Sequence, residues 1–145
     1  MQNSWRIQHD RDHGAGAYTW YFPDGDRPPL DNGPAEAHES LMILNTSQHP
    51  ANVELDLYWT DKEPTLGIKV RVEAERVRCL HVPWFEDPND TQRVEIPFRT
   101  QYAIRVRSDV PVICQYGRLE VIPNHMLYTT MGYVNPSEEE RKQTL

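Results

Sequence analysis

The chain has only two cysteines among its 145 residues, and they form no CxxC pair. A disulfide-rich framework therefore does not hold this domain together. Cys79 and Cys114 each stand within an apolar run typical of a strand, so we expect two small buried thiols in a reducing compartment. A disulfide between neighbouring strands is the alternative.

The sequence also lacks the features of membrane and nucleic-acid-binding proteins. No apolar run approaches the roughly 18–20 residues of a membrane span, and the amino-terminal sequence MQNSWRIQHD has no apolar signal core. Acidic side chains outnumber basic ones by 22 to 15, and the net charge of −7 argues against a phosphate surface as the main partner. Because the charges are mixed along the chain, a local basic strip remains open. We expect a soluble, cytoplasmic protein for which nucleic acid is not a partner.

A helical stripe is missing from every segment before the carboxyl-terminal tail. Period-two alternation recurs instead and places apolar side chains on one face of a strand. The run at 110–119 is apolar on both faces, so we expect a central, buried strand there. Turn-forming residues separate the runs, among them Ser108 and Asp109. The expected strands are 40–46, 53–59, 68–74, 77–82, 102–107, 110–119 and 127–134.

These short, regularly spaced strands, with 12 prolines and 7 glycines, predict an all-β fold. We expect an antiparallel β-sandwich, with a barrel as the alternative, and assign a single domain to residues 1–135. Residues 136–145 have a capping Ser137 and an acidic first turn but no apolar face, which predicts a short tail that is flexible or helical.

Five blocks in the middle of the chain carry a family resemblance. In order they are AHESLMILNTS (37–47), VELDLYWTDKEP (53–64), VRVEAERVRCLHV (70–82), SDVPVICQYGRLE (108–120) and LYTTMGYV (127–134). Their order and spacing resemble the sensory rhodopsin transducer family of small soluble bacterial proteins. The resemblance implies a β-sandwich assembled as a cyclic homotetramer. It also implies signal transduction beside a photosensory membrane rhodopsin or, in the wider family, binding of small molecules such as sugars, without catalysis.

The resemblance carries over particular residues. The His-Glu pair of the family is His38-Glu39, the Asn that follows is Asn45, and the Asp-x-Glu-Pro turn holds Asp61 and Glu63. The later strand pattern of the family matches Gln115, Arg118, Leu119 and Glu120. Two positions depart from it. Cys79 and His81 stand where relatives often have His and then Arg, and Tyr-Gly stands before Arg118 in place of His-Thr.

The amino-terminal stretch HDRDH (9–13) offers imidazole and carboxylate groups that suit zinc or iron. The glycines that follow disfavour a helix, and in a strand His9 and His13 would lie about 13 Å apart. Relatives lack most of this stretch, so the resemblance implies that residues 8–20 are a loop insertion. We interpret it as a hydrated polar loop and expect no metal and no cofactor; His9 and His13 are the candidate ligands if a metal binds.

We hypothesise that a small polar molecule, such as a sugar, binds at one end of the sandwich or between subunits. Sugar recognition needs flat aromatic faces beside hydrogen-bonding groups. The aromatic cluster 18–22, which includes Trp20, is therefore either such a platform or a subunit interface. Arg118 follows a buried strand and needs an acidic partner, Glu39 or Glu120, or an anionic ligand. The candidate ligand-binding residues are His38, Glu39, Asn45, Asp61, Glu63, Gln115, Arg118 and Trp20.

Two other functions remain open. The first is an adaptor that docks on a membrane photoreceptor, a sensory rhodopsin, without a small ligand. The second is a sugar-active or metal-dependent enzyme that uses His38 and Glu39 or a metal at the histidine stretch. We expect no catalytic residues. We also expect a homo-oligomer, most simply the tetramer, because a small sandwich does not readily hide four tryptophans and seven tyrosines.

Overall fold

The computed structural model describes residues 13–29, 37–82, 84–86, 93–122, 125–127 and 132–134. Every regular element in these ranges is a β-strand, and the strands pair antiparallel. The predicted all-β, antiparallel fold is confirmed. The strands are β1 (Ala17–Asp26), β2 (His38–Asn45), β3 (Ala51–Trp59), β4 (Thr65–Val72), β5 (Arg76–Val82), β6 (Trp84–Glu86), β7 (Arg93–Glu95), β8 (Gln101–Ile122), β9 (His125–Leu127) and β10 (Tyr133–Val134).

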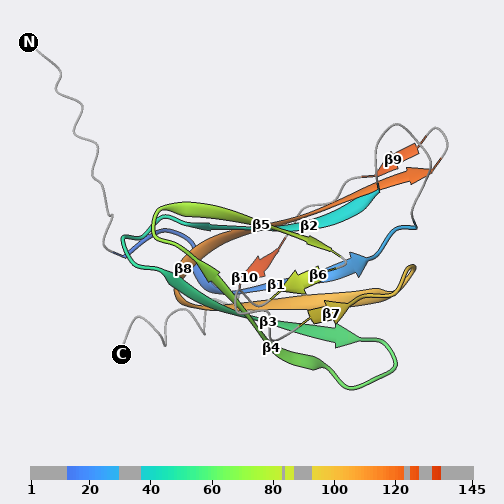
Figure 1. Ribbon diagram of the computed structural model, residues 1–145, viewed down its shortest axis with the longest axis horizontal. Helices are drawn as coiled ribbons and strands as arrows, with labels where there is room; N and C mark the ends of the chain where they lie inside the picture. Colours follow the sequence, from blue (N-terminus) through green and yellow to red (C-terminus); the bar gives the residue numbers. More distant parts are fainter. Residues whose placement is uncertain are drawn as a thin grey trace, which may run out of the picture.

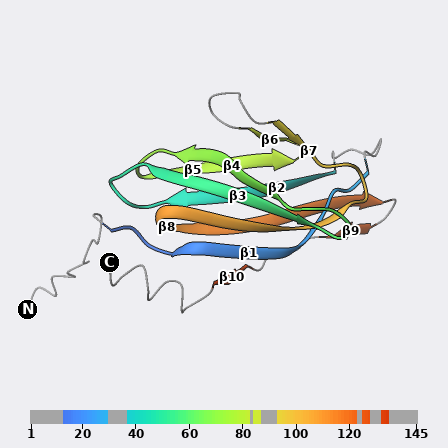
Figure 2. The ribbon, with the colours of Figure 1, turned by 90° about the horizontal axis from the view of Figure 1, so that it is seen from below.

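The long strand β8 joins the two layers of the sandwich. Its first half pairs with β1 and β3, and its second half pairs with β2. Between the halves the strand bends and returns in the other layer, as the orange ribbon in Figure 1 shows. One layer therefore has the order β10-β1-β8-β3-β4, and the other has the order β8-β2-β5. The hairpin of β6 and β7 lies on the β4–β5 side, and β10 lies on the opposite side, beyond β1 (Figure 2).

The core lies between the two layers and follows the alternation expected from the sequence. In β3, for example, Val53, Leu55 and Leu57 are buried. Burying one such aliphatic side chain contributes about 1.5–3 kcal/mol. The other members of the core are Phe22, Leu41, Ile43, Ala51, Ile68, Val70, Val72, Leu80, Ile96, Tyr102, Ile104, Val106, Val112, Cys114 and Tyr116.

The bend in β8 corrects the prediction of a turn at Ser108 and Asp109. Ser108 is still paired with β3, and Val112 is paired with Ala17 of β1, so strand pairing continues on both sides of the bend. The Asp109 carboxylate accepts hydrogen bonds from the backbone nitrogen and the side-chain nitrogen of Asn52, at 2.8 and 2.7 Å. Residues that favour turns thus tie the bend to β3 without ending the strand.

The structure also corrects part of the predicted loop insertion. Residues 17–20 are the first part of β1, where Thr19 pairs with Arg107 and Trp20 pairs with Val106. The strand forms because buried positions alternate there, with Ala17 and Thr19 both buried. Residues 8–12 of the predicted loop and the tail at 136–145 lie outside the described residues.

The two cysteines are both free but differ in burial. Cys114 is buried among core residues, as predicted, and Cys79 is exposed, so the prediction for Cys79 is wrong. Cys79 alternates with the buried Leu80 and therefore lies on the outer face of β5. None of the described residues forms a helix of the length and hydropathy that crossing a bilayer requires.

Candidate functional site

Four buried polar residues and the half-buried Asp26 gather at the end of the sandwich where β2 begins. Alternation along β2 puts Glu39 on the inner face, and alternation along β8 puts Tyr116 and Arg118 there as well. The register of β2 and β8 sets Glu39 directly opposite Arg118. Tyr102, at the start of β8, and Asp26, at the end of β1, complete the group through their contacts with Glu39. We call these five residues the Glu39 cluster.

Glu39 is the centre of this cluster and is fully buried, with an exposed fraction of 0 %. Its Oε1 atom accepts hydrogen bonds from the Tyr116 hydroxyl at 2.5 Å, the Tyr102 hydroxyl at 2.9 Å and the Asp26 backbone nitrogen at 3.0 Å. Its Oε2 atom is buried and has no hydrogen-bond partner among the described residues. One carboxyl oxygen of Glu39 therefore accepts three hydrogen bonds, and the other accepts none from the described residues.

Burial raises the pKa of Glu39 above its usual range, because desolvation disfavours the charged carboxylate. The hydrogen bonds from Tyr116, Tyr102 and the Asp26 backbone, together with the charge of Arg118, oppose this rise. Burial and the neighbouring Glu39 charge also raise the pKa of both tyrosine hydroxyls. Tyr102 and Tyr116 therefore keep their protons at neutral pH and act as hydrogen-bond donors.

Arg118 brings a positive charge into the cluster and is only 7 % exposed. Its Nε and Nη1 atoms are buried and make no hydrogen bond within the described part of the chain. The ion pair of Arg118 is with Asp24, at 3.8 Å from Nη1 to Oδ1, and the Asp24 side chain is 61 % exposed. The sequence places Arg118 after a buried strand, and the structure shows that Arg118 is itself buried. Of its two predicted partners, Glu120 is instead paired with Arg99.

A bulge in β1 brings Asp24 and Asp26 to the cluster. The pairing with β8 shifts between Phe22 and Gly25, and Gly25 then lies opposite Tyr102. A side chain at Gly25 would not fit, because a Cβ atom there would come within 2.7 Å of the Tyr102 ring. The Oδ1 atom of Asp26 is buried, and the described residues offer it no hydrogen-bond partner.

The cluster thus combines two acceptors, Glu39 Oε2 and Asp26 Oδ1, with the two donor nitrogens of Arg118, none of them hydrogen-bonded within the described residues. Leaving a buried polar group unpaired costs about 1–3 kcal/mol, and more if it is charged. Groups of this kind can form hydrogen bonds with a polar molecule that offers both donors and acceptors. Chemically the arrangement suits recognition of hydroxyl and carboxylate groups.

Asp56 provides an internal contrast on the outer face of the other layer. This carboxylate is also fully buried, yet it accepts hydrogen bonds from Arg105 at 2.8 Å, from Arg107 at 3.1 Å and from the Gly67 backbone at 2.8 Å. Burial alone would raise the pKa of Asp56, but these hydrogen bonds and the Arg107 charge lower it overall. Both carboxylate oxygens of Asp56 therefore have hydrogen-bond partners within the protein, and the role of this carboxylate is structural.

Two candidate residues from the sequence lie beside the Glu39 cluster but on the other face of the layer. His38 precedes Glu39, and its ring stands 5.5 Å, centroid to centroid, from the ring of His81 on β5. Gln115 pairs with Met42 and is exposed. Alternation along β2 and β8 places both side chains outward, away from Glu39 and Arg118.

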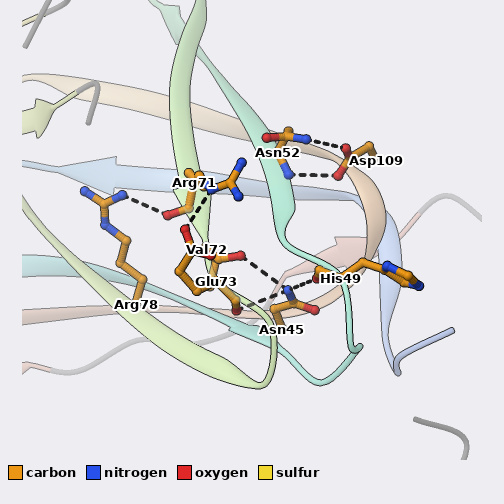
Figure 3. Close-up of polar contacts among 8 residues, drawn as sticks. All are labelled: Asn45, His49, Asn52, Arg71, Val72, Glu73, Arg78 and Asp109. Atoms are coloured by element: carbon orange, nitrogen blue, oxygen red, sulfur yellow. Dashed lines mark hydrogen bonds and ion pairs between the residues drawn. The ribbon is translucent and has the colours of Figure 1, made fainter. Parts of the chain in front are cut away.

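Asn45 lies at the opposite end of β2 from Glu39, about 20 Å away along the strand. Its side-chain nitrogen donates to the carbonyl oxygens of His49, Val72 and Glu73, at 2.7, 3.3 and 3.3 Å (Figure 3). Its side-chain oxygen accepts from the backbone and hydroxyl of Ser47. The side chain of Asn45 therefore stabilises the turn that follows β2.

Asp61 and Glu63 are exposed in the connection between β3 and β4. Trp20, by contrast, packs against the core, and its indole nitrogen donates to the carbonyl oxygen of Val112 at 2.8 Å. Its ring is stacked with that of Phe22, at 6.3 Å between centroids. The structure thus brings together only Glu39 and Arg118 of the eight candidate residues.

The metal hypothesis rests on residues of which only His13 is described, and it is exposed in a turn; His9 lies outside the described residues. Within the described ranges, no group of three or more His, Cys, Asp or Glu side chains is arranged to hold a metal ion. Cys79 and His81 form a pair on the surface of β5, with 3.7 Å between Sγ and Nε2.

Sequence reasoning missed Asp26, Tyr102 and Tyr116 as parts of the site. Both tyrosines are in phase with core residues of their strand, so alternation marks them as core without revealing the hydroxyl contacts. The one available signal is Glu39, an acidic residue in phase with the apolar Leu41 and Ile43. A buried carboxylate needs donors, and a tyrosine on a buried face can supply one.

The fold and the cluster together define a two-layer antiparallel β-sandwich with an unsaturated polar site buried at one end. A family model, the Anabaena sensory rhodopsin transducer, matches residues 15–134. The chain belongs to this family, and the resemblance seen in the sequence is confirmed.

Two solved structures support this assignment. The crystal structure of Thermotoga maritima 1070 is 31% identical, covering 83% of this chain and 96% of that one, with a TM-score of 0.68. The Anabaena sensory rhodopsin transducer is 34% identical, covering 73% of this chain and 98% of that one, with a TM-score of 0.62. No curated protein matches the chain.

Proposed function

We propose that this protein is a ligand-binding domain that recognises a small polar molecule, such as a sugar, at the Glu39 cluster. The observation that carries the proposal is the set of buried, unpartnered atoms among the described residues: Glu39 Oε2, Asp26 Oδ1 and the Nε and Nη1 of Arg118. A hydroxyl group both donates and accepts a hydrogen bond. A molecule with several hydroxyls therefore satisfies the carboxylates and the guanidinium at once.

The binding role is non-enzymatic in this proposal. The two tyrosines next to Glu39 have raised pKa values and hold their protons, so they orient the carboxylate and do not act as bases. They fix Oε1, which leaves Oε2 to contact a ligand. A preorganised acceptor of this kind reduces the entropy that is lost on binding.

The test is isothermal titration calorimetry with D-glucose, D-galactose, mannitol, D-glucuronate, D-galacturonate and D-gluconate. We expect at least one of these probes to bind the wild-type protein. The Glu39→Gln variant should weaken that binding about tenfold or more, since a hydrogen bond to a charged group contributes about 1.5–3 kcal/mol. Glu73→Gln is the matched control, because Glu73 is an exposed acid beside Asn45, at the far end of the sandwich (Figure 3).

Failure of all six probes to bind, or equal binding by wild type and Glu39→Gln, would overturn this proposal. Circular dichroism of each variant establishes that the fold is retained.

An adaptor role is the second candidate function. It is favoured by the similarity to a protein named as a sensory rhodopsin transducer, at 34% identity. In that role the chain would work in the cytoplasm and bind a membrane photoreceptor. Co-purification with a sensory rhodopsin from the same genome tests it, and lack of a complex in mild detergent would count against it.

We also propose a homotetramer. Val77, Leu44 and Ile113 are neighbours in register across β5, β2 and β8 on the outer face of that layer. Val77 is 65% exposed and Ile113 is 39% exposed, so an apolar strip faces outward, as at surfaces that associate. Light scattering should give four times the 17.0 kDa mass of one chain; the mass of a single chain would refute the assembly.

A further inference from the structure

The ion pairs of this protein show that Arg118 is unlike the other paired arginines among the described residues. Arg71, Arg99, Arg105 and Arg107 each have a carboxylate oxygen within 3.1 Å. Arg118 is more deeply buried than any of these four, yet its ion pair is 3.8 Å long. At that distance no hydrogen bond forms. The most buried of these five guanidinium groups therefore has the longest and weakest ion pair.

Glu39 does not supply the missing contact. Although it lies opposite Arg118 in the strand register, its Oε1 is already occupied by three donors. Neither Glu39 Oε2 nor the Nε and Nη1 of Arg118 are hydrogen-bonded within the described residues. Burial also raises the pKa of Glu39, which weakens it as a permanent negative partner.

Asp24 has the properties of a displaceable counter-ion. It lies in the β1 bulge, its side chain is 61% exposed, and its Oδ1 also accepts a hydrogen bond from Gln101 at 3.3 Å. Because the pair of Asp24 with Arg118 is long and its acidic partner is exposed, this pair contributes little to stability. A ligand carboxylate that contacts Arg118 directly replaces this long pair with charge-assisted hydrogen bonds, which are the stronger kind.

Building on the proposed function, we propose that the ligand is a hydroxy acid, whose carboxylate displaces Asp24 from Arg118 and whose hydroxyl groups donate to Glu39 Oε2 and Asp26 Oδ1. Each unpartnered atom of the cluster then has a partner of the correct kind. The carboxylate supplies the acceptors that the guanidinium lacks, and the hydroxyls supply the donors that the two acids lack. A sugar acid has both groups on one small skeleton.

The test compares each acid with its neutral counterpart by calorimetry: D-glucuronate with D-glucose, and D-galacturonate with D-galactose. We expect an acid to bind wild type at least tenfold more tightly than its neutral counterpart. Asp24→Asn should tighten binding of that acid about twofold to fivefold, because it removes the competing charge. Glu73→Gln is the matched control, since the Glu73 side chain is 63% exposed and is also paired with an arginine, and it should change nothing.

Arg118→Lys supplies a second readout that keeps the positive charge but removes the guanidinium geometry. It should weaken binding of the acid about tenfold and weaken binding of the neutral sugar by a smaller factor. Equal binding of acids and neutral sugars, or weaker binding of the acid by Asp24→Asn, would overturn the hydroxy-acid proposal and leave the proposed function standing. Binding of none of the six probes of the proposed function, to wild type or to Asp24→Asn, would overturn both.

Discussion

Tyr102 and Tyr116 belong to the same strand and donate hydrogen bonds to the same oxygen atom of Glu39. They reach it because β8 bends between them (Figure 1). Tyr102 is paired with β3 in one layer of the sandwich, and Tyr116 is paired with β2 in the other. The bend therefore builds the site as well as the fold. It also fixes which oxygen of Glu39 has no hydrogen-bond partner among the described residues.

Replacing Glu39 by glutamine should change how stability depends on pH. The folded-state pKa of Glu39 is raised, so the folded protein holds this proton more tightly than the unfolded chain. Stability therefore falls as pH rises from the ordinary glutamate pKa of 4.5 through the raised pKa of Glu39, and is level above it. We expect Glu39→Gln to flatten this decline, as measured by urea unfolding between pH 4.5 and 8. Parallel pH profiles for the two proteins would contradict the assignment.

Gly25→Ala should disturb the cluster from the side of β1. The added Cβ atom would meet the Tyr102 ring at 2.7 Å, so the ring must move and its hydrogen bond to Glu39 must lengthen. Overpacking of this kind costs about 1–3 kcal/mol. Thermal unfolding measures the loss, and calorimetry with the tightest-binding probe should show weaker binding.

Gly67→Ala is the comparison for that experiment. Gly67 has open space around it but a φ of 74°, so alanine is strained there without touching the Glu39 cluster. It should lower stability and leave the affinity for the probe unchanged. If both alanine variants bind the probe as wild type does, the close contact of Gly25 with Tyr102 does not control the site.

Asn45→Ala should separate stability from binding. The side chain of Asn45 donates to three carbonyl oxygens and accepts from Ser47 in a fully buried place, so its removal leaves several groups unpaired (Figure 3). We expect a loss of about 2–4 kcal/mol in the free energy of unfolding. The affinity of the folded protein for a probe should be unchanged. Weaker binding at full stability would instead make Asn45 a ligand contact.

The two thiols should react at very different rates in the folded protein. Cys79 is exposed, whereas burial raises the pKa of the Cys114 thiol well above its usual range. We expect one equivalent of rapid reaction with Ellman's reagent, and none in Cys79→Ser until denaturant is added. Two rapid equivalents in the wild-type protein would contradict the burial of Cys114.

The fold could be predicted from the sequence because polar and apolar residues alternate along several of its strands, β3 and β4 among them. Leu55 and Leu57 point inward for the same reason that their polar neighbours point outward, and this period needs no tertiary information. The bend at Ser108 and Asp109 could not be predicted in this way. The same residue types end strands elsewhere, and here the bonds from Asn52 to Asp109 keep the chain extended.

The site was only partly predictable for a related reason. The sequence pointed to Glu39 and Arg118, since each is a charged residue at a position where the alternation of its strand otherwise places buried side chains. Asp26 and Tyr102 join them only through the register of β1 against β8, which a single sequence does not contain. Asn45 carried the same in-phase signal as Glu39 but lies at the other end of β2, where its partners are backbone carbonyls.

The most direct test of ligand binding at the Glu39 cluster is a crystal structure of the protein with the tightest-binding probe. We predict that a hydroxyl of the probe lies within hydrogen-bond distance of Glu39 Oε2 and that a probe oxygen contacts the guanidinium of Arg118. A probe bound elsewhere, with Glu39 and Arg118 hydrogen-bonded directly to each other, would contradict the account.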